Sequence, residues 1–71
     1  MKAENLERKN TEIRDQAHLM DAEGACDIEP TEQEIQEYLS GMGWIAYDIN
    51  ISYDNMQGFW RWNCDIKKLV K

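Results

Sequence analysis

Forty-six consecutive residues, from Asp15 to Trp60, contain no lysine and no arginine. The first 14 residues carry four basic and three acidic side chains, and residues 61–71 carry four basic and one acidic. The ends therefore contribute +1 and +3, and ten carboxylates in the middle bring the net charge to −6. A negative potential repels nucleic acid and anionic membranes and attracts basic protein surfaces, so nucleic-acid binding through the middle is not expected. The ten carboxylates belong to Asp15, Asp21, Glu23, Asp27, Glu29, Glu32, Glu34, Glu37, Asp48 and Asp54.

Soft metal ligands are scarce, since the chain has two cysteines, Cys26 and Cys64, and one histidine, His18. No CxxC or HxxxH spacing is present, so we expect no metal site and no cofactor, and we expect both cysteines to be thiols. The chain has no run of about 20 apolar residues that would span a bilayer. Its start has no apolar run typical of a secretory signal. These absences predict a cytoplasmic protein without a role at a membrane.

Seventy-one residues predict one small domain, residues 1–71. A domain of this size buries only about 60% of the surface that its unfolded chain exposes, so its core is thin. All seven aromatic side chains lie between Tyr38 and Trp62, which places the core in residues 31–71. Such a chain has little room for a pocket of roughly several hundred Å3, and no set of nucleophile, base and orienting group is evident. We therefore do not expect an enzyme.

The spacing of apolar residues predicts a long amphipathic helix over residues 1–23, which would extend beyond the core. Its seam follows the alternating three- and four-residue steps of a heptad pattern, and Gly24 is a natural end for such a helix. An asparagine in the seam favours a homodimer of paired helices. The alternative is a helix that lies across its own hairpin, and the sequence does not decide between the two. The seam consists of Ala3, Leu6, Asn10, Ile13, Ala17 and Met20.

Thr31 and Glu34 predict the start of a second, shorter helix. In a capping box the threonine oxygen accepts the backbone N–H three residues on, and the glutamate accepts the threonine N–H. Pro30 favours an extended residue before it, so the helix should not begin earlier. The spacing of the following apolar residues gives one helical face, which consists of Ile35, Tyr38, Leu39 and Met42.

From Trp44 onward the apolar period changes to two, which predicts an antiparallel β-hairpin. Its strands cover residues 45–53 and 59–64, and residues 54–58 have turn chemistry. Residues 65–71 either extend the second strand or begin a helical turn. The predicted fold is α+β with the order ααββ: a long helix, a short helix and a hairpin. The predicted inward face carries Ile45, Tyr47, Ile49, Ile51 and Tyr53 on the first strand and Trp60, Trp62 and Cys64 on the second.

The acidic middle predicts a protein-interaction module that docks a basic surface of an unknown partner protein. Trp44 and Phe59 have the opposite parity to the inward face, and together they would form an exposed apolar patch of the kind that marks binding surfaces. Size and composition also suit accessory or inhibitory proteins, including those of phages and other mobile elements, although no particular residue carries this association. The alternative is a charge that serves only solubility. The candidate partner-binding residues are Glu29, Glu32, Glu34, Glu37, Trp44 and Phe59.

A nucleic-acid-linked regulator is the second functional hypothesis. Trp60 and Trp62 would stack on the bases of a single strand while C-terminal cations contact the phosphates, although the parity of both tryptophans favours burial. In a third hypothesis the spaced carboxylates imitate phosphates and inhibit a nucleic-acid-binding protein, but a charge of −6 on 71 residues is moderate. The candidate nucleic-acid contacts are Arg61, Lys67, Lys68 and Lys71.

Overall fold

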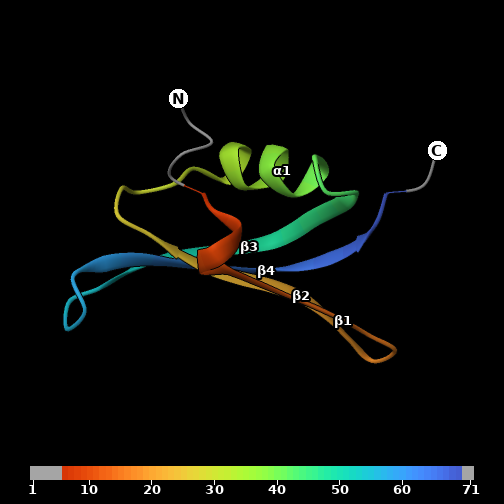
Figure 1. Cartoon of the computed structure of the whole chain (residues 1–71), viewed down its shortest axis with the longest axis horizontal. Coiled ribbons are helices and arrows are strands. Elements are labelled where there is room, and N and C mark those ends of the chain that lie inside the picture. Colours follow the sequence, from red (N-terminus) through yellow and green to blue (C-terminus); the bar gives the residue numbers. More distant parts are fainter. Residues whose placement is uncertain (1–5, 70–71) are drawn as a thin grey trace.

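Four antiparallel strands form one sheet, and a single helix lies on one of its faces (Figure 1). The computed structural model describes residues 6–69. The strand order is β1-β2-β4-β3, so two hairpins join through β2 and β4 at the centre of the sheet. The elements of this part of the chain are the 3-10 turn η2 (Arg8–Asn10), β1 (Thr11–Gln16), β2 (Leu19–Cys26), α1 (Glu32–Ser40), β3 (Trp44–Asp54) and β4 (Phe59–Lys68).

The predicted order ααββ is wrong, because the described part of residues 1–23 contains no α-helix. Instead, η2 leads into the β1–β2 hairpin, which pairs from Thr11 opposite Gly24 to Gln16 opposite Leu19. The two-residue turn of this hairpin, residues 17–18, lacks the Asn-Gly or Asp-Gly chemistry that marks a hairpin in a sequence. Its strands also contain several good helix formers. Local propensity therefore indicates the wrong element here.

Tertiary packing decides the conformation of this N-terminal segment. One face of β4 carries Trp62, Cys64 and Ile66, each 3% exposed or less, so β4 needs a neighbour on both sides. β2 supplies the second neighbour and places Ala22 opposite Cys64 and Gly24 opposite Trp62. A Cβ atom on Gly24 would lie 2.7 Å from ring atoms of Trp62. The glycine that was expected to end a helix therefore makes room within a strand for a buried indole.

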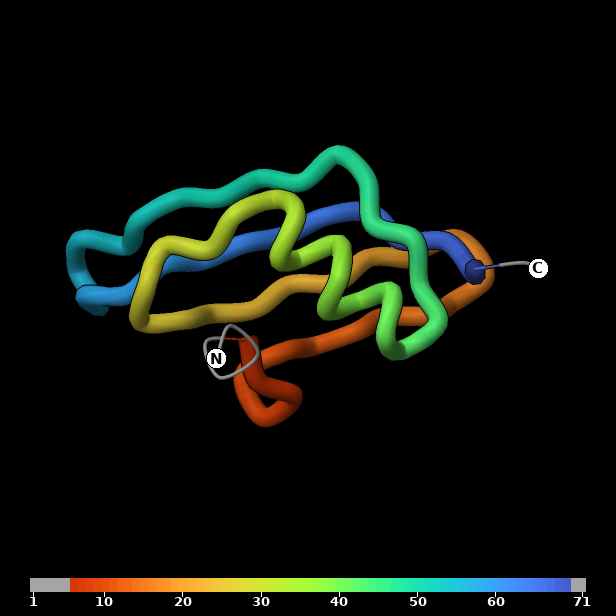
Figure 2. Tube along the Cα trace, turned by 90° about the horizontal axis from the view of Figure 1, so that it is seen from above, coloured from red at the N-terminus to blue at the C-terminus, as the bar shows by residue number. Residues whose placement is uncertain are grey.

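The helix α1 begins as the sequence predicts. Thr31 Oγ1 accepts the N–H of Glu34 at 3.1 Å, and Glu34 Oε1 accepts the N–H of Thr31 at 2.9 Å, so the predicted capping box is confirmed. Ile35 and Leu39 are fully buried. Figure 2 shows that α1 crosses the sheet obliquely, which lets one face of the helix cover the central strands.

The strands predicted for the second hairpin are present as β3 and β4, but their pairing shifts within β3. From Tyr47 to Asn50, three steps along β3 match two steps along β4. Asp48 has a φ of 54° at this bulge, a left-handed conformation that aspartate tolerates better than most residues. The extra residue reverses the alternation of side chains, so the single inward face predicted for this strand is wrong. Ile45 and Tyr47 point away from α1, whereas Ile49 and Ile51 pack against the core.

The C-terminal residues continue β4 rather than begin a helical turn. Ile66 is buried opposite Ala46, and the strand extends to Lys68. The N–H of Leu69 then donates to the carbonyl of Gly43 at 3.0 Å, which ties the end of β4 to the start of β3.

The face of the sheet under α1 holds the core, and we call it the inner face; the opposite face is the outer face. α1 covers the middle of the inner face, and the two hairpin tips extend beyond it in opposite directions (Figure 1). Among residues 6–69, no helix is long and apolar enough to cross a membrane. The buried core consists of Leu6, Ala22, Cys26, Ile35, Leu39, Ala46, Trp62, Cys64 and Ile66.

Candidate functional site

Two arginines at the borders of the acidic stretch fold back onto it. Arg14 immediately precedes the stretch and Arg61 immediately follows it. In the fold, Arg14 pairs with Asp21 and Glu23, and Arg61 pairs with Asp54. The expectation that the stretch has no counter-charge is therefore wrong for these three carboxylates.

Arg14 holds three carboxylates of the β1–β2 hairpin. The strand register sets Arg14 opposite Asp21 and sets Glu12 opposite Glu23. Arg14 Nε donates to Asp21 Oδ1 at 2.7 Å, and Nη1 lies 3.3 Å from one oxygen of Glu12 and of Glu23. Hydrogen bonds to Asp21 and then Glu23 raise the pKa of Arg14 above its ordinary value. Since like charges directly opposite on a sheet are destabilising, Arg14 makes the facing pair of glutamates tolerable.

Asp54 organises the turn between β3 and β4. Its Oδ1 accepts the backbone N–H groups of Met56 and Gln57, both at 3.0 Å, and its Oδ2 accepts Arg61 Nε at 2.9 Å. The hydrogen bond from Arg61, followed by that from Gln57, lowers the pKa of Asp54 below its ordinary value. The carboxylate therefore belongs to the architecture of the turn.

Five further carboxylates lie on the loop after β2 and on α1, and we call them the acidic segment. None of the five has a nitrogen of a described lysine, arginine or histidine within 4.0 Å. Glu34 serves the capping box, and a negative charge in the first turn also stabilises a helix through its dipole, which accounts for Glu32 as well. Glu37 accepts a hydrogen bond from Gln33 at 3.1 Å. The acidic segment consists of Asp27, Glu29, Glu32, Glu34 and Glu37.

Three other described carboxylates also lack an ion pair within residues 6–69, but they are dispersed over the sheet. Asp15 lies on β1, Asp48 at the bulge of β3 and Asp65 on β4. Consecutive unpaired carboxylates are thus a property of the acidic segment. All four glutamates that were predicted to bind a partner lie in this segment: Glu29, Glu32, Glu34 and Glu37.

The structure separates Trp44 and Phe59, which were expected to form one exposed patch. Trp44 starts β3 and packs against the core from the inner face. Phe59 starts β4 opposite the far end of β3, and its ring lies 5.1 Å from the guanidinium carbon of Arg61. The bulge explains why the prediction for Trp44 was wrong. It reverses the alternation of side chains within β3, so residues after the bulge do not predict the side on which Trp44 lies.

The cations proposed for nucleic-acid binding do not share one surface. Arg61 is engaged by its ion pair, and Asp65 lies between Arg61 and Lys67 on the same side of β4. By the alternation of a strand, Lys68 points to the other side. Lys71 lies outside the described residues. These positions do not provide the continuous basic track that a phosphate backbone requires.

The two tryptophans of the same hypothesis differ in exposure. Trp62 is 1% exposed and therefore cannot stack on a base, which agrees with the burial that its parity predicts. Trp60 is half-buried, and its ring meets the ring of Tyr53 edge-on with centroids 5.1 Å apart.

The residues of the predicted dimer seam do not form a stripe. They are distributed over the segment before η2, η2 itself, two strands and a hairpin turn, so the coiled-coil interpretation is wrong within the described residues. Ala3 lies outside those residues. Leu6 is buried in the core, Asn10 lies in η2, Ile13 in β1, Ala17 in the hairpin turn and Met20 in β2.

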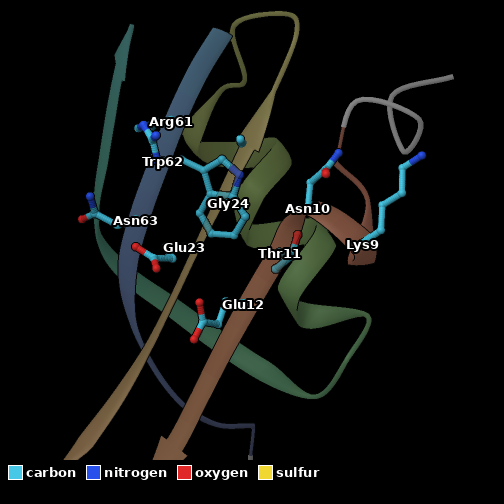
Figure 3. A pocket seen from close by; sticks show the side chains of 10 residues that line it. Lys9, Asn10, Thr11, Glu12, Glu23, Gly24, Arg61, Trp62 and Asn63 are labelled. Carbon is cyan, nitrogen blue, oxygen red and sulfur yellow. The ribbon is translucent and has the colours of Figure 1, made fainter. Parts of the chain in front are cut away.

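A hollow of about 340 Å3 lies where η2 and the start of β1 meet β2 and β4 (Figure 3). Its lining brings together Lys9, Arg61, Glu12 and Glu23, so it offers charges of both signs. An adjoining hollow of about 390 Å3 extends it toward the start of β4. Hollows of this size were not expected in so short a chain. No histidine or serine is among the described residues that line them, and Cys26, which lines the second hollow, is a buried thiol.

The indole of Trp62 lies beside Gly24 at this hollow (Figure 3). Its buried Nε1 has no hydrogen-bond partner among the described groups. An unpaired buried donor costs about 1–3 kcal/mol, while burying an aromatic side chain of this size contributes more than that. Packing of the ring on the glycine therefore dominates at this position.

Cys26 and Cys64 are buried thiols on neighbouring strands. Cys26 lies opposite Trp60 and Cys64 opposite Ala22, so they occupy different rows of the sheet. Burial, followed by the charges of Asp65 and Asp21, raises the pKa of Cys64 to about 11. Within residues 6–69, no three histidine, cysteine, aspartate or glutamate side chains are grouped so as to hold a metal ion.

Two exposed apolar side chains beside the acidic segment could not be predicted from the sequence. Ile28, 69% exposed, lies between Asp27 and Glu29 in the chain, and one apolar residue between two charged residues gives no periodic signal. Tyr53 lies on the inner face as its parity predicts, yet it is 48% exposed because α1 does not cover it. The extent of a covering helix cannot be read from the alternation of a strand.

No protein-family model matches the chain, and neither a curated protein nor a solved structure matches it significantly.

Proposed function

We propose that this chain is a protein-interaction module that docks a basic surface of a partner protein through the acidic segment. It acts by occupying that surface, as an accessory or inhibitory protein does, and no catalytic step is part of the proposal. The supporting observation is the contrast in pairing: residues 27–37 carry five carboxylates without an ion pair in the described structure, while Arg14 and Arg61 hold the carboxylates nearest to them. Unpaired carboxylates attract a basic surface and accelerate encounter with it.

The test reverses charge where the fold does not need it. Glu29 lies before the capping box and Glu37 lies beyond the first turn of α1, so the double variant Glu29→Lys/Glu37→Lys keeps Thr31 and Glu34 intact. The control variant Asp15→Lys/Asp65→Lys changes two unpaired carboxylates of the sheet. Both variants change the net charge from −6 by +4 to −2, so they differ only in where the charge lies.

The measurement is quantitative capture of proteins from cells of the source organism by the wild-type chain and by both variants. We expect at least one basic protein to be captured by the wild type and the control, but about tenfold less by Glu29→Lys/Glu37→Lys. Its capture should weaken as salt is raised, because exposed charges are screened. Equal capture by both variants, or equal loss in both, would contradict docking through the acidic segment. Urea unfolding of all three proteins should give free energies within about 0.5 kcal/mol, as expected for exposed substitutions.

A further inference from the structure

Among residues 6–69, α1 does not extend over the inner face at the end of the sheet where the helix begins. Cys26, Trp60 and Tyr53 form one row across β2, β4 and β3 at this end. Exposure increases along the row, from buried Cys26 through half-buried Trp60 to Tyr53 at 48%. Figure 1 shows the cause: the β3–β4 hairpin continues beyond the first turn of α1. The core side of this hairpin therefore meets solvent.

Ile28 adds a second apolar side chain at the same end. It follows Cys26 by two residues, so its Cα lies within about 7 Å of the Cα of Cys26. Its side chain is 69% exposed. Figures 1 and 2 both place the loop that carries it at the end of the sheet where the β3–β4 turn lies. We call Ile28, Tyr53 and Trp60 the end patch.

Carboxylates of the acidic segment border the end patch. Asp27 and Glu29 flank Ile28 in the chain and both are exposed, and exposed Glu32 begins the adjoining helix. No ion pair involves these three side chains in the described residues. Apolar surface with a charged border is typical of interaction sites. The end patch and its bordering carboxylates are complementary to a partner segment that carries both an apolar side chain and a cation.

We propose that the end patch and the bordering carboxylates bind a basic amphipathic segment of a partner protein, in which an apolar side chain stands next to lysines or arginines. This proposal rests on the proposed function and names the chemistry of the partner. The apolar side chain packs on Ile28 and Tyr53, and the neighbouring cations face Asp27, Glu29 and Glu32. A cation also binds favourably over the face of a tyrosine, so Tyr53 contributes to both parts. The small patch predicts a transient complex.

The test uses three labelled 16-residue peptides and fluorescence anisotropy. The first peptide interleaves lysines with leucines, the second replaces each leucine with serine, and the third replaces each lysine of the first with glutamate. We expect the lysine–leucine peptide to bind about tenfold more tightly than the lysine–serine peptide. The lysine–serine peptide should bind weakly and be released by salt, and the glutamate peptide should not bind.

Variants of the end patch then separate apolar contact from charge. Ile28→Ser/Tyr53→Ser should abolish the preference for the lysine–leucine peptide and leave binding of the lysine–serine peptide unchanged. The matched control is Leu19→Ser, which changes an apolar side chain of similar exposure (47%) at the other hairpin. In addition, the lysine–leucine peptide should change the tryptophan fluorescence of the wild type, and Trp60→Phe should lose most of that change.

Each remaining outcome overturns the proposal. Equal binding of the two lysine peptides, unaffected by Ile28→Ser/Tyr53→Ser, would show recognition by charge alone and would leave the proposed function standing. Loss of the preference in Leu19→Ser would place the apolar contact elsewhere. Salt-sensitive binding of a 16-nucleotide thymidine strand that is lost in Ile28→Ser/Tyr53→Ser would make the patch a stacking platform for nucleic acid. Concentration-dependent self-association that is lost in the same variant would make a second copy the occupant.

Discussion

The ion-paired carboxylates of the sheet and the carboxylates of the acidic segment have the same chemistry but different surroundings. On the sheet, Glu12, Asp21 and Glu23 surround Arg14, and Asp54 is held by Arg61 and by the backbone of its turn. On the loop and α1, the five carboxylates have no described cation within ion-pair distance. Net charge alone does not show this division. Antiparallel pairing creates it, because the pairing brings the arginines at the borders of the acidic stretch next to particular residues.

We infer that the ion-paired carboxylates of the sheet stabilise the fold, whereas those of the acidic segment bind a partner. Substitutions of the ion-paired side chains of the sheet should therefore change the free energy of unfolding, whereas charge reversals in the acidic segment should change binding. Urea unfolding measures the free energies below; the Arg14 and Asp54 variants test the role of the ion pairs, and the Gly24 and Thr31 variants give the scale set by packing and capping.

Gly24→Val should cause the largest loss of stability. Its Cβ would lie 2.7 Å from the Trp62 ring, and overpacking of a rigid core costs about 1–3 kcal/mol, occasionally more. We expect a loss of about 3 kcal/mol or more because the neighbour is a buried ring. The control Gly41→Ala should be nearly neutral, since Gly41 has a helical φ of −63° and its nearest contact for a Cβ is 3.5 Å. A tolerated Gly24→Val would contradict the packing of β2 against β4.

Thr31→Ala should cost about 1 kcal/mol, because it removes the side-chain acceptor of the N-cap. Thr31→Ser keeps the hydroxyl and should retain most of that stability. Equal stability of the two variants would show that the capping box contributes little. Glu34 of the acidic segment has a structural role as well, because its side chain accepts the Thr31 N–H and its own N–H donates to Thr31 Oγ1.

Arg14→Gln should lower stability less than loss of the cap, because its ion pairs are partly exposed and screened by water. The variant leaves Glu12 and Glu23 facing each other without a cation. Raising the salt concentration should reduce the difference from wild type. Lys9→Gln is the control, because Lys9 is 78% exposed and pairs only with Glu7 among the described residues. If both variants behave alike, Arg14 does not organise the carboxylates of the hairpin.

Asp54→Asn should have the smallest effect, and that effect should depend on pH. The pKa of Asp54 is lowered in the fold from an ordinary value of 3.8. The ionised carboxylate therefore stabilises the fold above that value, and this contribution is lost as the pH falls through the lowered pKa. The wild type should be more stable than Asp54→Asn at about pH 7, and the difference should shrink below about pH 4. A difference that does not change with pH would contradict the assignment.

Local signals allowed part of this fold to be predicted from the sequence. The capping box of Thr31 and Glu34 specifies the start of a helix within four residues, and it is present. The alternation of Trp60, Trp62 and Cys64 correctly predicts one strand face, because β4 has no bulge in its described register. Such features depend on neighbours in the chain, which a sequence shows directly.

The remaining features depend on contacts between distant residues. Gly24 indicates a helix end locally, but Trp62, 38 positions away, makes it a strand residue. The bulge at Asp48 reverses the parity that placed Trp44 outside. The acidic stretch was correctly identified as a run without cations, yet register alone reveals that Arg14 and Arg61 neutralise part of it. The four glutamates of the predicted site lie in one segment without ion pairs in the described residues, whereas the structure separates Trp44 from Phe59. That these glutamates bind a partner stays a prediction.

The most direct test of the proposed division of charge is an NMR titration of the 15N-labelled chain with a lysine hexamer. We expect amide shift changes confined to residues 27–37, and we expect them to disappear at high salt. Shift changes centred on residues 12–23, or spread evenly over the chain, would show that the carboxylates of the sheet are equally available. That result would contradict the claim that the acidic segment is the surface left for a partner.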